Sequence, residues 1–432
     1  MENLVFNLEK GEGKFKILNA VTGGPWHKRY SNDQYRSNFA DYKAARIPYS
    51  RNHDLGLKNH FSHDVSQIFP NFDADENEPA SYDFAVTDES ILCTLDGGTK
   101  TFFRLGESID HDIKKHRSYA PKDFHKWARI CEHIIRHYTE GWADGYELDM
   151  PYWEIWNEPD LSDATWIGTK EEFFDFFEIA AKHLKSCFPH LKIGGPGMTG
   201  GSKNFAWAQD FLSEMQKREV PLDFFTWHRY TKTPEDTIER ADRIQAMLDA
   251  NGYSEAEHII DEWNYIRGWT EDFQYSLNSI IAEKGAAFMM AAISAAQASK
   301  NIDMMVYYDN RPSSVFNGIF NFYTCERFKG YYAIAWYGQN YYDLESFIPC
   351  QTKADNLYTL CGTDKDGKIT CIVTHYSEND KTAPKKVNLD FGRPAKFEVY
   401  LVDKNHDGEL IKVTEEHTFE LPVHSFMLLK EV

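Results

Sequence analysis

Two glutamates carry the clearest chemical signal in the sequence. Residues 153–160 read W-E-I-W-N-E-P-D, so Asn157 and Glu158 stand where an apolar run ends and Pro159 forces a turn. A second apolar run, I-I-D-E-W-N at residues 259–264, ends in the same way at Glu262. Glycoside hydrolysis needs two carboxyl groups: one protonates the leaving oxygen, and the other attacks the anomeric carbon or activates water. The two glutamates therefore predict cleavage of a glycosidic bond, provided that the fold brings them together.

The surrounding elements determine whether the two carboxyls can meet. Short apolar runs alternate with amphipathic helical stretches over the first three quarters of the chain, which is typical of parallel βα units. Helices are expected from Pro121, from Glu171 and from Lys284. Eight strands, the number that a closed barrel needs, are expected at residues 15–20, 44–49, 101–105, 152–156, 191–194, 223–227, 258–261 and 304–308. Because the fourth and seventh strands can face each other across the mouth of such a barrel, the two carboxyls can become partners.

The last quarter of the chain has a different pattern. After about Tyr342, short alternating strands and turn signals such as Asp366-Gly367 and Asp407-Gly408 replace the helical stretches. We therefore expect an α/β protein with a catalytic (β/α)8 TIM barrel over residues 14–341. A small β-sandwich accessory domain is expected over residues 342–432, and the N-terminal segment 1–13 would supply a strand that joins it.

Composition excludes several classes of partner. The formal net charge of -20 would repel nucleic acid and anionic membranes. No apolar run of about 18 residues is present, so no membrane association is expected. The seven cysteines are scattered without a C-x-x-C pair, which argues against a disulfide framework or a zinc site, and no metal or cofactor is expected. We expect a cytoplasmic protein, or a periplasmic or secreted one if a signal peptide has been removed.

The sequence resembles family 39 of the glycoside hydrolases, the β-xylosidase and α-L-iduronidase group of retaining barrel enzymes. The resemblance is almost continuous over residues 121–233. It passes through the W-N-E-P strand, through P-H-L-K-I-G-G-P at residues 189–196 and through V-P-L-D-F-F-T-W-H-R-Y-T at residues 220–231, and it returns at D-E-W-N. It implies that Glu158 is the general acid/base and Glu262 the nucleophile, on strands four and seven.

The resemblance also implies a set of supporting residues. Asn157 would donate to the sugar 2-hydroxyl, a contact that strengthens in the transition state. Arg51 and His53, in S-R-N-H-D, match the family's Arg-x-His and would hold the nucleophile ionised and bind sugar hydroxyls. His228 and Tyr230 match its His-x-Tyr, with the tyrosine hydroxyl orienting the nucleophile. Trp263, directly after the nucleophile, is a further candidate for substrate contact.

Two departures from the family pattern leave the sugar open. Arg104 stands where related β-xylosidases usually carry an acidic residue, and Glu107 follows shortly after as a candidate substrate ligand. Tyr308 and Asp309 lie near the place of the family's tryptophan platform. Asp309 could bind a hydroxyl that xylose lacks, a neighbouring basic group could accept a carboxylate, or these residues could form a surface ion pair.

The expected function is a retaining, exo-acting glycosidase that acts on an oligosaccharide or glycoside, with β-xylosidase the first activity that the resemblance implies. A β-galactosidase, an α-L-arabinosidase or an endo-acting enzyme of the same family is the alternative. A non-catalytic carbohydrate-binding protein on the same barrel is a further one. The sequence leaves the oligomeric state open, a homo-oligomer included.

Overall fold

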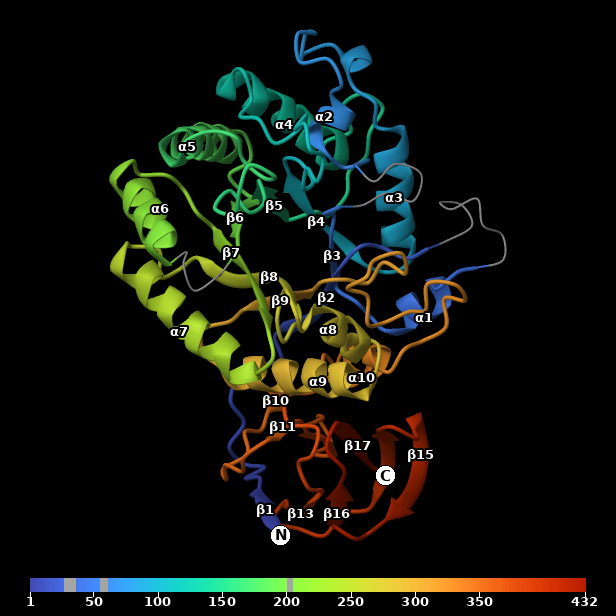
Figure 1. Ribbon diagram of the computed structural model, residues 1–432. Coiled ribbons are helices and arrows are strands. Elements are labelled where there is room, and N and C mark those ends of the chain that lie inside the picture. Colours follow the sequence, from blue (N-terminus) through green and yellow to red (C-terminus); the bar gives the residue numbers. More distant parts are fainter. Residues whose placement is uncertain (27–35, 55–60, 200–204) are drawn as a thin grey trace.

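A closed barrel of eight parallel strands forms the larger part of the molecule (Figure 1). The computed structural model describes residues 1–26, 36–54, 61–199 and 205–432. The barrel strands follow one another in chain order: β2 (Ile17–Thr22), β3 (Tyr49–Arg51), β4 (Lys100–Leu105), β5 (Tyr152–Ile155), β6 (Lys192–Met198), β7 (Phe224–Thr231), β8 (Glu257–Tyr265) and β9 (Met304–Tyr307). This confirms the predicted TIM barrel, with Glu158 following the fourth barrel strand and Glu262 lying in the seventh.

Helices surround the barrel strands (Figure 1). The helix expected from Pro121 begins only at Phe124, where Asp123 caps α4 by accepting from the Lys126 amide. The helix expected from Glu171 begins one residue earlier, and Thr169 and Glu172 form a capping box at α5. The helices are α1 (Phe39–Ala44), α2 (Val65–Ile68), η1 (Pro79–Ser81), α3 (Ala85–Asp96), α4 (Phe124–Thr139), α5 (Lys170–Cys187), α6 (Phe205–Lys217), α7 (Pro234–Ala250), α8 (Phe273–Ile280), α9 (Glu283–Ala298) and α10 (Gly330–Asn340).

The strand expected at residues 44–49 is wrong. Ala44 is the last residue of α1, Arg46 has a φ of 51°, and the strand β3 begins only at Tyr49. Ala45 and Ile47 are buried, so their apolar character reflects packing of a helix end and not a strand. Strands β6, β7 and β8 extend four residues beyond the predicted ends, because the added residues include glycine and polar side chains that interrupt the apolar runs, such as Gly197, His228 and Glu262.

The C-terminal strands form two further sheets that are consistent with a β-sandwich. One has the order β10-β11-β12-β17-β14-β15, and the other has the order β1-β13-β16, in which β1 pairs in parallel with β13. Phe6, Phe397 and Leu429 belong to the separate apolar core of these strands. The strands are β1 (Glu2–Val5), β10 (Ser346–Phe347), β11 (Leu357–Thr363), β12 (Ile369–His375), β13 (Lys385–Asp390), β14 (Phe397–Val402), β15 (Asp407–Thr414), β16 (Thr418–Leu421) and β17 (Ser425–Glu431). The division into folding domains at residue 342 stays a prediction.

Within the described ranges, no single helix is both long and apolar enough to cross a membrane. The helices α8 and α9 reach that length and apolar composition only as a pair, and the chain bends by 79° between them.

Candidate active site

The turn after β5 presents Glu158 at the carboxyl end of the barrel. Trp156 and Glu158 both have left-handed backbone conformations, with φ of 74° and 49°, which are uncommon for residues with a side chain. The Trp156 amide donates to the Leu105 carbonyl at 2.7 Å, and the Glu158 amide donates to the Gly197 carbonyl at 2.9 Å. The neighbouring strands therefore hold this turn in a strained shape, as is common where a side chain must be aimed at a ligand.

A β-bulge in β8 brings two consecutive carboxyls to the inside of the barrel. Trp227 of β7 is paired with Ile260, but the next residue, His228, is paired with Glu262, so Asp261 is the extra residue. Trp263 then points outward and packs against Phe288 of α9 and Tyr307 of β9. The prediction that Trp263 contacts substrate is therefore wrong, because this indole belongs to the layer between barrel and helices.

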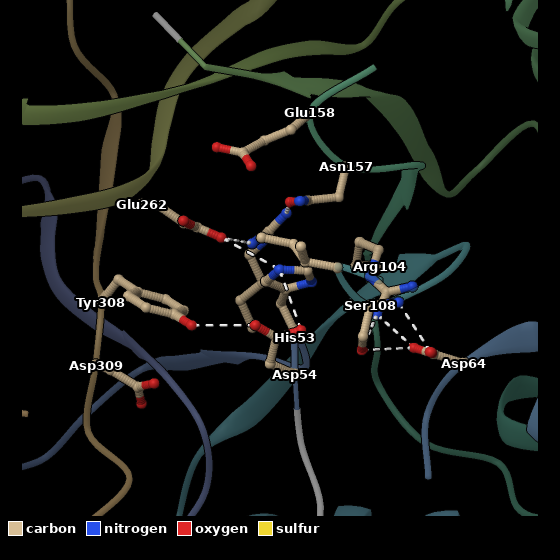
Figure 2. Close-up of polar contacts among 12 residues, drawn as sticks. His53, Asp54, Asp64, Arg104, Ser108, Asn157, Glu158, Glu262, Tyr308 and Asp309 are labelled. Atoms are coloured by element: carbon tan, nitrogen blue, oxygen red, sulfur yellow. Dashed lines mark hydrogen bonds and ion pairs between the residues drawn. The ribbon is translucent and has the colours of Figure 1, made fainter. Parts of the chain in front are cut away.

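Glu158 and Glu262 approach each other from different strands and point into the same space (Figure 2). One oxygen of each carboxyl and one ring nitrogen of His228 all lie within 4.8 Å of one another. The Nδ1 atom of His228 lies 2.8 Å from Oε1 of Glu158 and 3.4 Å from Oε2 of Glu262. The tertiary structure thus unites the two carboxyls that the sequence separates by about a hundred residues.

Arg51 lies beneath the two carboxyls and connects Glu262 to other polar residues of the site. Its guanidinium donates through Nη1 to Glu262 Oε1 at 2.8 Å, through Nη2 to Asn157 Oδ1 at 2.7 Å and through Nε to Glu154 Oε2 at 2.7 Å. The same Nη2 lies 3.0 Å from Asp261 Oδ2. A planar guanidinium suits such a site because its donors have fixed directions. Arg51 therefore holds the nucleophile candidate and leaves the Asn157 amide nitrogen available for a ligand.

Two groups of β7 also contact the nucleophile candidate. The Tyr230 hydroxyl donates to Glu262 Oε2 at 2.8 Å, as the family resemblance implies. Burial alone would lower the pKa of His228, but the carboxylates of Glu262, Asp261 and Glu158 outweigh it and raise the pKa well above its usual value. His228 is therefore an imidazolium that lies between the two catalytic candidates.

His53 does not supply the expected positive charge. Its Nε2 atom lies 3.7 Å from Glu262 Oε1 and 3.5 Å from Asp54 Oδ1, so the ring is in the right place. Burial, however, lowers its pKa well below the usual value, and the ring is neutral. Arg51 and His228 provide the cations beside Glu262, while neutral His53 keeps one N–H and one lone pair for a sugar hydroxyl.

Burial dominates the protonation of Glu262. It raises the pKa of this carboxyl to about 7, although His228 and Arg51 act in the opposite direction. Glu158 and Asp261 add to the rise because their negative charges disfavour a third one nearby. The sequence-based expectation that its neighbours hold Glu262 ionised therefore applies above about pH 7 and not at acidic pH.

Asp309 is committed to an ion pair. It is fully buried and accepts from the Arg311 amide and Nε, both at 2.8 Å. In Figure 2 its carboxyl points away from Glu262. Tyr308 lies closer to the catalytic pair and donates its hydroxyl to Asp54 Oδ2 at 3.1 Å. Of the roles considered for Asp309, the ion pair is the one found, but it is internal and not at the surface.

Arg104, on the third barrel strand β4, also forms an ion pair, with Asp64. Arg104 donates to Asp64 Oδ1 at 2.8 Å, and its Nε and Nη1 atoms have no hydrogen-bond partner among the described residues (Figure 2). Glu107 accepts from the Ser66 amide and hydroxyl at 3.0 and 2.6 Å and lines a cavity of about 170 Å³. Burial, with a contribution from Asp64, raises its pKa to about 8. Glu107 thus belongs to this side cavity and not to the cluster around Glu262.

Several site residues were not found from the sequence: Glu154, Asp261, Asp54, Asp64 and Arg311. Glu154 and Asp261 stand inside apolar strand runs, and both are fully buried. A charged residue within a buried strand requires a partner, which is the signal that could have identified them. Their partner, Arg51, lies about a hundred residues or more away, so only the fold reveals the pairing.

Two side-chain groups among the described residues have distances that would allow a metal ion. One is the trio Glu158, His228 and Glu262. The other is Glu132, His183 and Cys187 on α4 and α5, in which Glu132 Oε2 lies 2.7 Å from His183 Nε2. In the first group, hydrogen bonds and ion pairs account for the contacts, so a metal is not required to explain the arrangement.

Two β-xylosidases match part of the chain. The one from Geobacillus stearothermophilus is 29% identical over 242 residues, which are 50% of this chain and 46% of the relative. The one from Caldicellulosiruptor saccharolyticus is 30% identical over 175 residues, which are 39% of this chain and 34% of the relative. The matches thus span less than half the length of these relatives.

Solved structures share the fold over the whole chain. A glucosidase from Croceicoccus marinus superposes with a TM-score of 0.81 at 22% identity, covering 100% of this chain and 99% of that structure. A monomeric β-xylosidase from Caulobacter crescentus CB15 superposes with a TM-score of 0.72 at 15% identity, covering 100% of this chain and 99% of the other. The family described as "Glycosyl hydrolases family 39" matches residues 31–298, more than half of the 432 residues. The chain therefore belongs to family 39 of the glycosyl hydrolases.

Proposed function

We propose that the protein is a retaining, exo-acting glycoside hydrolase that removes a terminal β-xylosyl unit or a close relative of it. The separation of the two carboxyls carries the proposal. Retaining enzymes hold them about 5–5.5 Å apart, whereas inverting enzymes leave about 6.5–9.5 Å for a water molecule. One oxygen of Glu158 lies within 4.8 Å of one oxygen of Glu262, which supports direct attack by one carboxylate.

In the proposed first step, ionised Glu262 attacks the anomeric carbon while Glu158 gives its proton to the leaving oxygen. Arg51 and Tyr230 hold one oxygen of Glu262 each, which fixes the direction of attack. In the second step, Glu158 takes a proton from water, and the hydroxide displaces Glu262 from the sugar. His228 donates toward both carboxyls and offsets the negative charge as it moves from one to the other.

Three observations bear on which sugar the protein binds. The names of the two sequence relatives favour a β-xyloside. A hexose would be favoured if Asp309 bound a hydroxyl that xylose lacks, but this carboxylate is occupied by Arg311. The Nε and Nη1 atoms of Arg104 have no hydrogen-bond partner among the residues that the structure describes, which favours a ligand with an acceptor group, so β-galactoside and α-L-arabinoside are also tested.

The test combines a substrate panel with nucleophile replacement. Aryl β-xyloside, β-galactoside, β-glucoside and α-L-arabinoside are assayed with the wild type, and the xyloside is expected to be cleaved fastest. Glu262→Gly should lose hydrolysis and regain turnover with azide, giving a glycosyl azide of inverted configuration. Glu158→Ala should lose far more rate on a substrate with a poor leaving group than on one with a good leaving group.

Two results would count against the proposal. Absence of turnover on every substrate, with sugar binding retained in Glu262→Gln, would indicate a carbohydrate-binding protein. Cleavage of internal bonds in a xylo-oligosaccharide series without release of the terminal sugar would replace exo-action with endo-action.

A further inference from the structure

A second pair of carboxyls lies beneath the catalytic pair, and the reaction proposed above does not use it. Glu154 of β5 and the bulge residue Asp261 of β8 are both fully buried. They flank Arg51, whose Nε donates to Glu154 Oε2 at 2.7 Å and whose Nη2 lies 3.0 Å from Asp261 Oδ2. Because Nη1 of the same guanidinium holds Glu262 at 2.8 Å, this buried pair contacts the nucleophile candidate through Arg51.

The charges around Arg51 require protons on some of the carboxyls. Two cations, Arg51 and imidazolium His228, are surrounded by four carboxyls, and an uncompensated buried anion is very unfavourable. The acid role places one proton on Glu158, so one further proton would make the group neutral with Glu262 ionised. The charged groups that act on Glu154 directly are Arg51 of β3 and Asp261 of β8. Glu262 contacts Arg51, and His228 of β7 contacts Asp261. Arg104 is the neighbour of Glu154 on β4 and is already paired with Asp64.

The structure provides a position for that further proton. Neither Glu154 Oε1 nor Asp261 Oδ2 accepts a hydrogen bond of good geometry from any described residue. Both atoms, and also Nη2 of Arg51, lie 3.4 Å from the point at which a side chain at Gly197 would carry its Cβ, so all three border the same small space. Gly197, with a φ of 62°, leaves that space open. A proton directed from Glu154 to Asp261 would give Glu154 Oε1 a partner and would add a hydrogen bond to Asp261 Oδ2, which already lies 3.0 Å from Arg51 Nη2 and 3.4 Å from His228 Nε2.

The two carboxyls differ in how easily they hold the proton. Burial and the nearby charge of Asp261 raise the pKa of Glu154 to about 8, although Arg51 acts against them. Asp261 is equally buried, but Arg51 and His228 together lower its pKa below the usual value. The proton therefore belongs on Glu154, with Asp261 as its acceptor.

We propose that Glu154 is a positioning residue: as a neutral carboxylic acid it shares its proton with Asp261, and its other oxygen holds Arg51 against Glu262. The positioning role rests on the proposed function, whereas the protonation of Glu154 is a property of the folded chain alone. Glu154 does not touch the sugar in this proposal and acts only through Arg51.

The protonation is tested without any turnover, by equilibrium unfolding of the wild type and Glu154→Gln between pH 5 and pH 8. The unfolded chain loses the Glu154 proton above about pH 4.5, while the folded wild type keeps it to about pH 8. As the pH rises from 5 to 8, the free energy of unfolding of the wild type should therefore fall relative to that of Glu154→Gln. The ratio of the two folding constants should change by up to about tenfold per pH unit. The matched control is Glu420→Gln, at an exposed glutamate of β16, for which the ratio to wild type should be flat.

The positioning role is tested by comparing two replacements of the same residue. Glu154→Leu removes the acceptor of Arg51 Nε and should lower kcat/KM by about 10- to 100-fold. Glu154→Gln keeps a carbonyl oxygen for Arg51 and an N–H for Asp261, so it should recover most of that loss.

The outcomes separate the two parts of the proposal. A pH-independent stability ratio for Glu154→Gln would show that Glu154 is ionised and would overturn its protonation. Equal losses of kcat/KM in Glu154→Leu and Glu154→Gln would overturn the positioning role. A wild type that hydrolyses no glycoside would refute the proposed function and with it the positioning role, while the unfolding measurement would still decide the protonation.

Discussion

Replacing Arg51 by lysine should move the pH at which the enzyme becomes active. Arg51 holds Glu262 Oε1 at 2.8 Å and also contacts Asn157, Glu154 and Asp261. Lysine keeps the positive charge but has a single nitrogen, so it cannot satisfy acceptors that lie in three directions. We expect the ammonium to settle away from Glu262 and the carboxylate to lose part of its stabilisation.

The size of the effect follows from the contact distance. With an effective dielectric constant of about 20, a unit charge at 2.8 Å stabilises the Glu262 carboxylate by about 6 kcal/mol. At a distance of about 4.8 Å the same charge contributes about 3.5 kcal/mol. The difference of about 2.5 kcal/mol corresponds to about two pKa units, so the pKa of Glu262, about 7 in the wild type, should rise toward 9.

The assay is the pH dependence of kcat/KM, which reports groups of the free enzyme. Glu262 must be ionised to attack, so the wild-type activity should rise with pH through about 7. This rise is the acidic limb of the pH profile, and in Arg51→Lys it should move to higher pH. Arg104→Lys is the matched control, because Arg104 is equally buried but is paired with Asp64. It should lower stability without moving the acidic limb. An acidic limb that stays in place in Arg51→Lys, or moves to lower pH, would refute the reasoning.

Two further predictions concern neighbours of Glu262. Tyr230→Phe removes the hydroxyl that donates to Glu262 Oε2 at 2.8 Å, and kcat/KM should fall by about 10- to 100-fold. The acidic limb of the pH profile should also move to higher pH. A change in KM alone would contradict this role. Trp263→Ala should lower the free energy of unfolding by about 3–5 kcal/mol, because the indole packs against Phe288 and Tyr307. If Trp263→Phe raised KM without affecting thermal stability, the tryptophan would face the sugar after all.

The barrel could be predicted because most of its strands are short apolar runs bounded by helical stretches. The second strand could not, since β3 has only three residues, Tyr49–Arg51, and the stronger apolar signal before it comes from Ala45 and Ile47. The strand ends were also placed too early, because residues such as His228, Glu262 and Asn264 continue a strand while carrying polar side chains.

In the candidate site, too, some residues could be identified from local sequence and others could not. Asn157, Glu158 and Glu262 were identified from local sequence, because each follows an apolar strand run at the end that forms a barrel mouth. Trp263 was assigned to the site by its position next to Glu262, and the bulge at Asp261 explains the error. A bulge changes which side chains face inward, and the sequence around Asp261 contains no turn residue that would predict it.

The sequence by itself therefore determined the barrel, the two catalytic candidates and the order in which the chain presents them. These follow from local patterns: apolar periodicity, a proline after Glu158 and carboxyls at strand ends. Only the tertiary structure decided that His53 is neutral, that Asp309 is bound to Arg311 and that Glu154 and Asp261 share the floor of the site. Protonation and pairing depend on burial and on charges supplied by distant strands, and neither quantity is present in a local stretch of sequence.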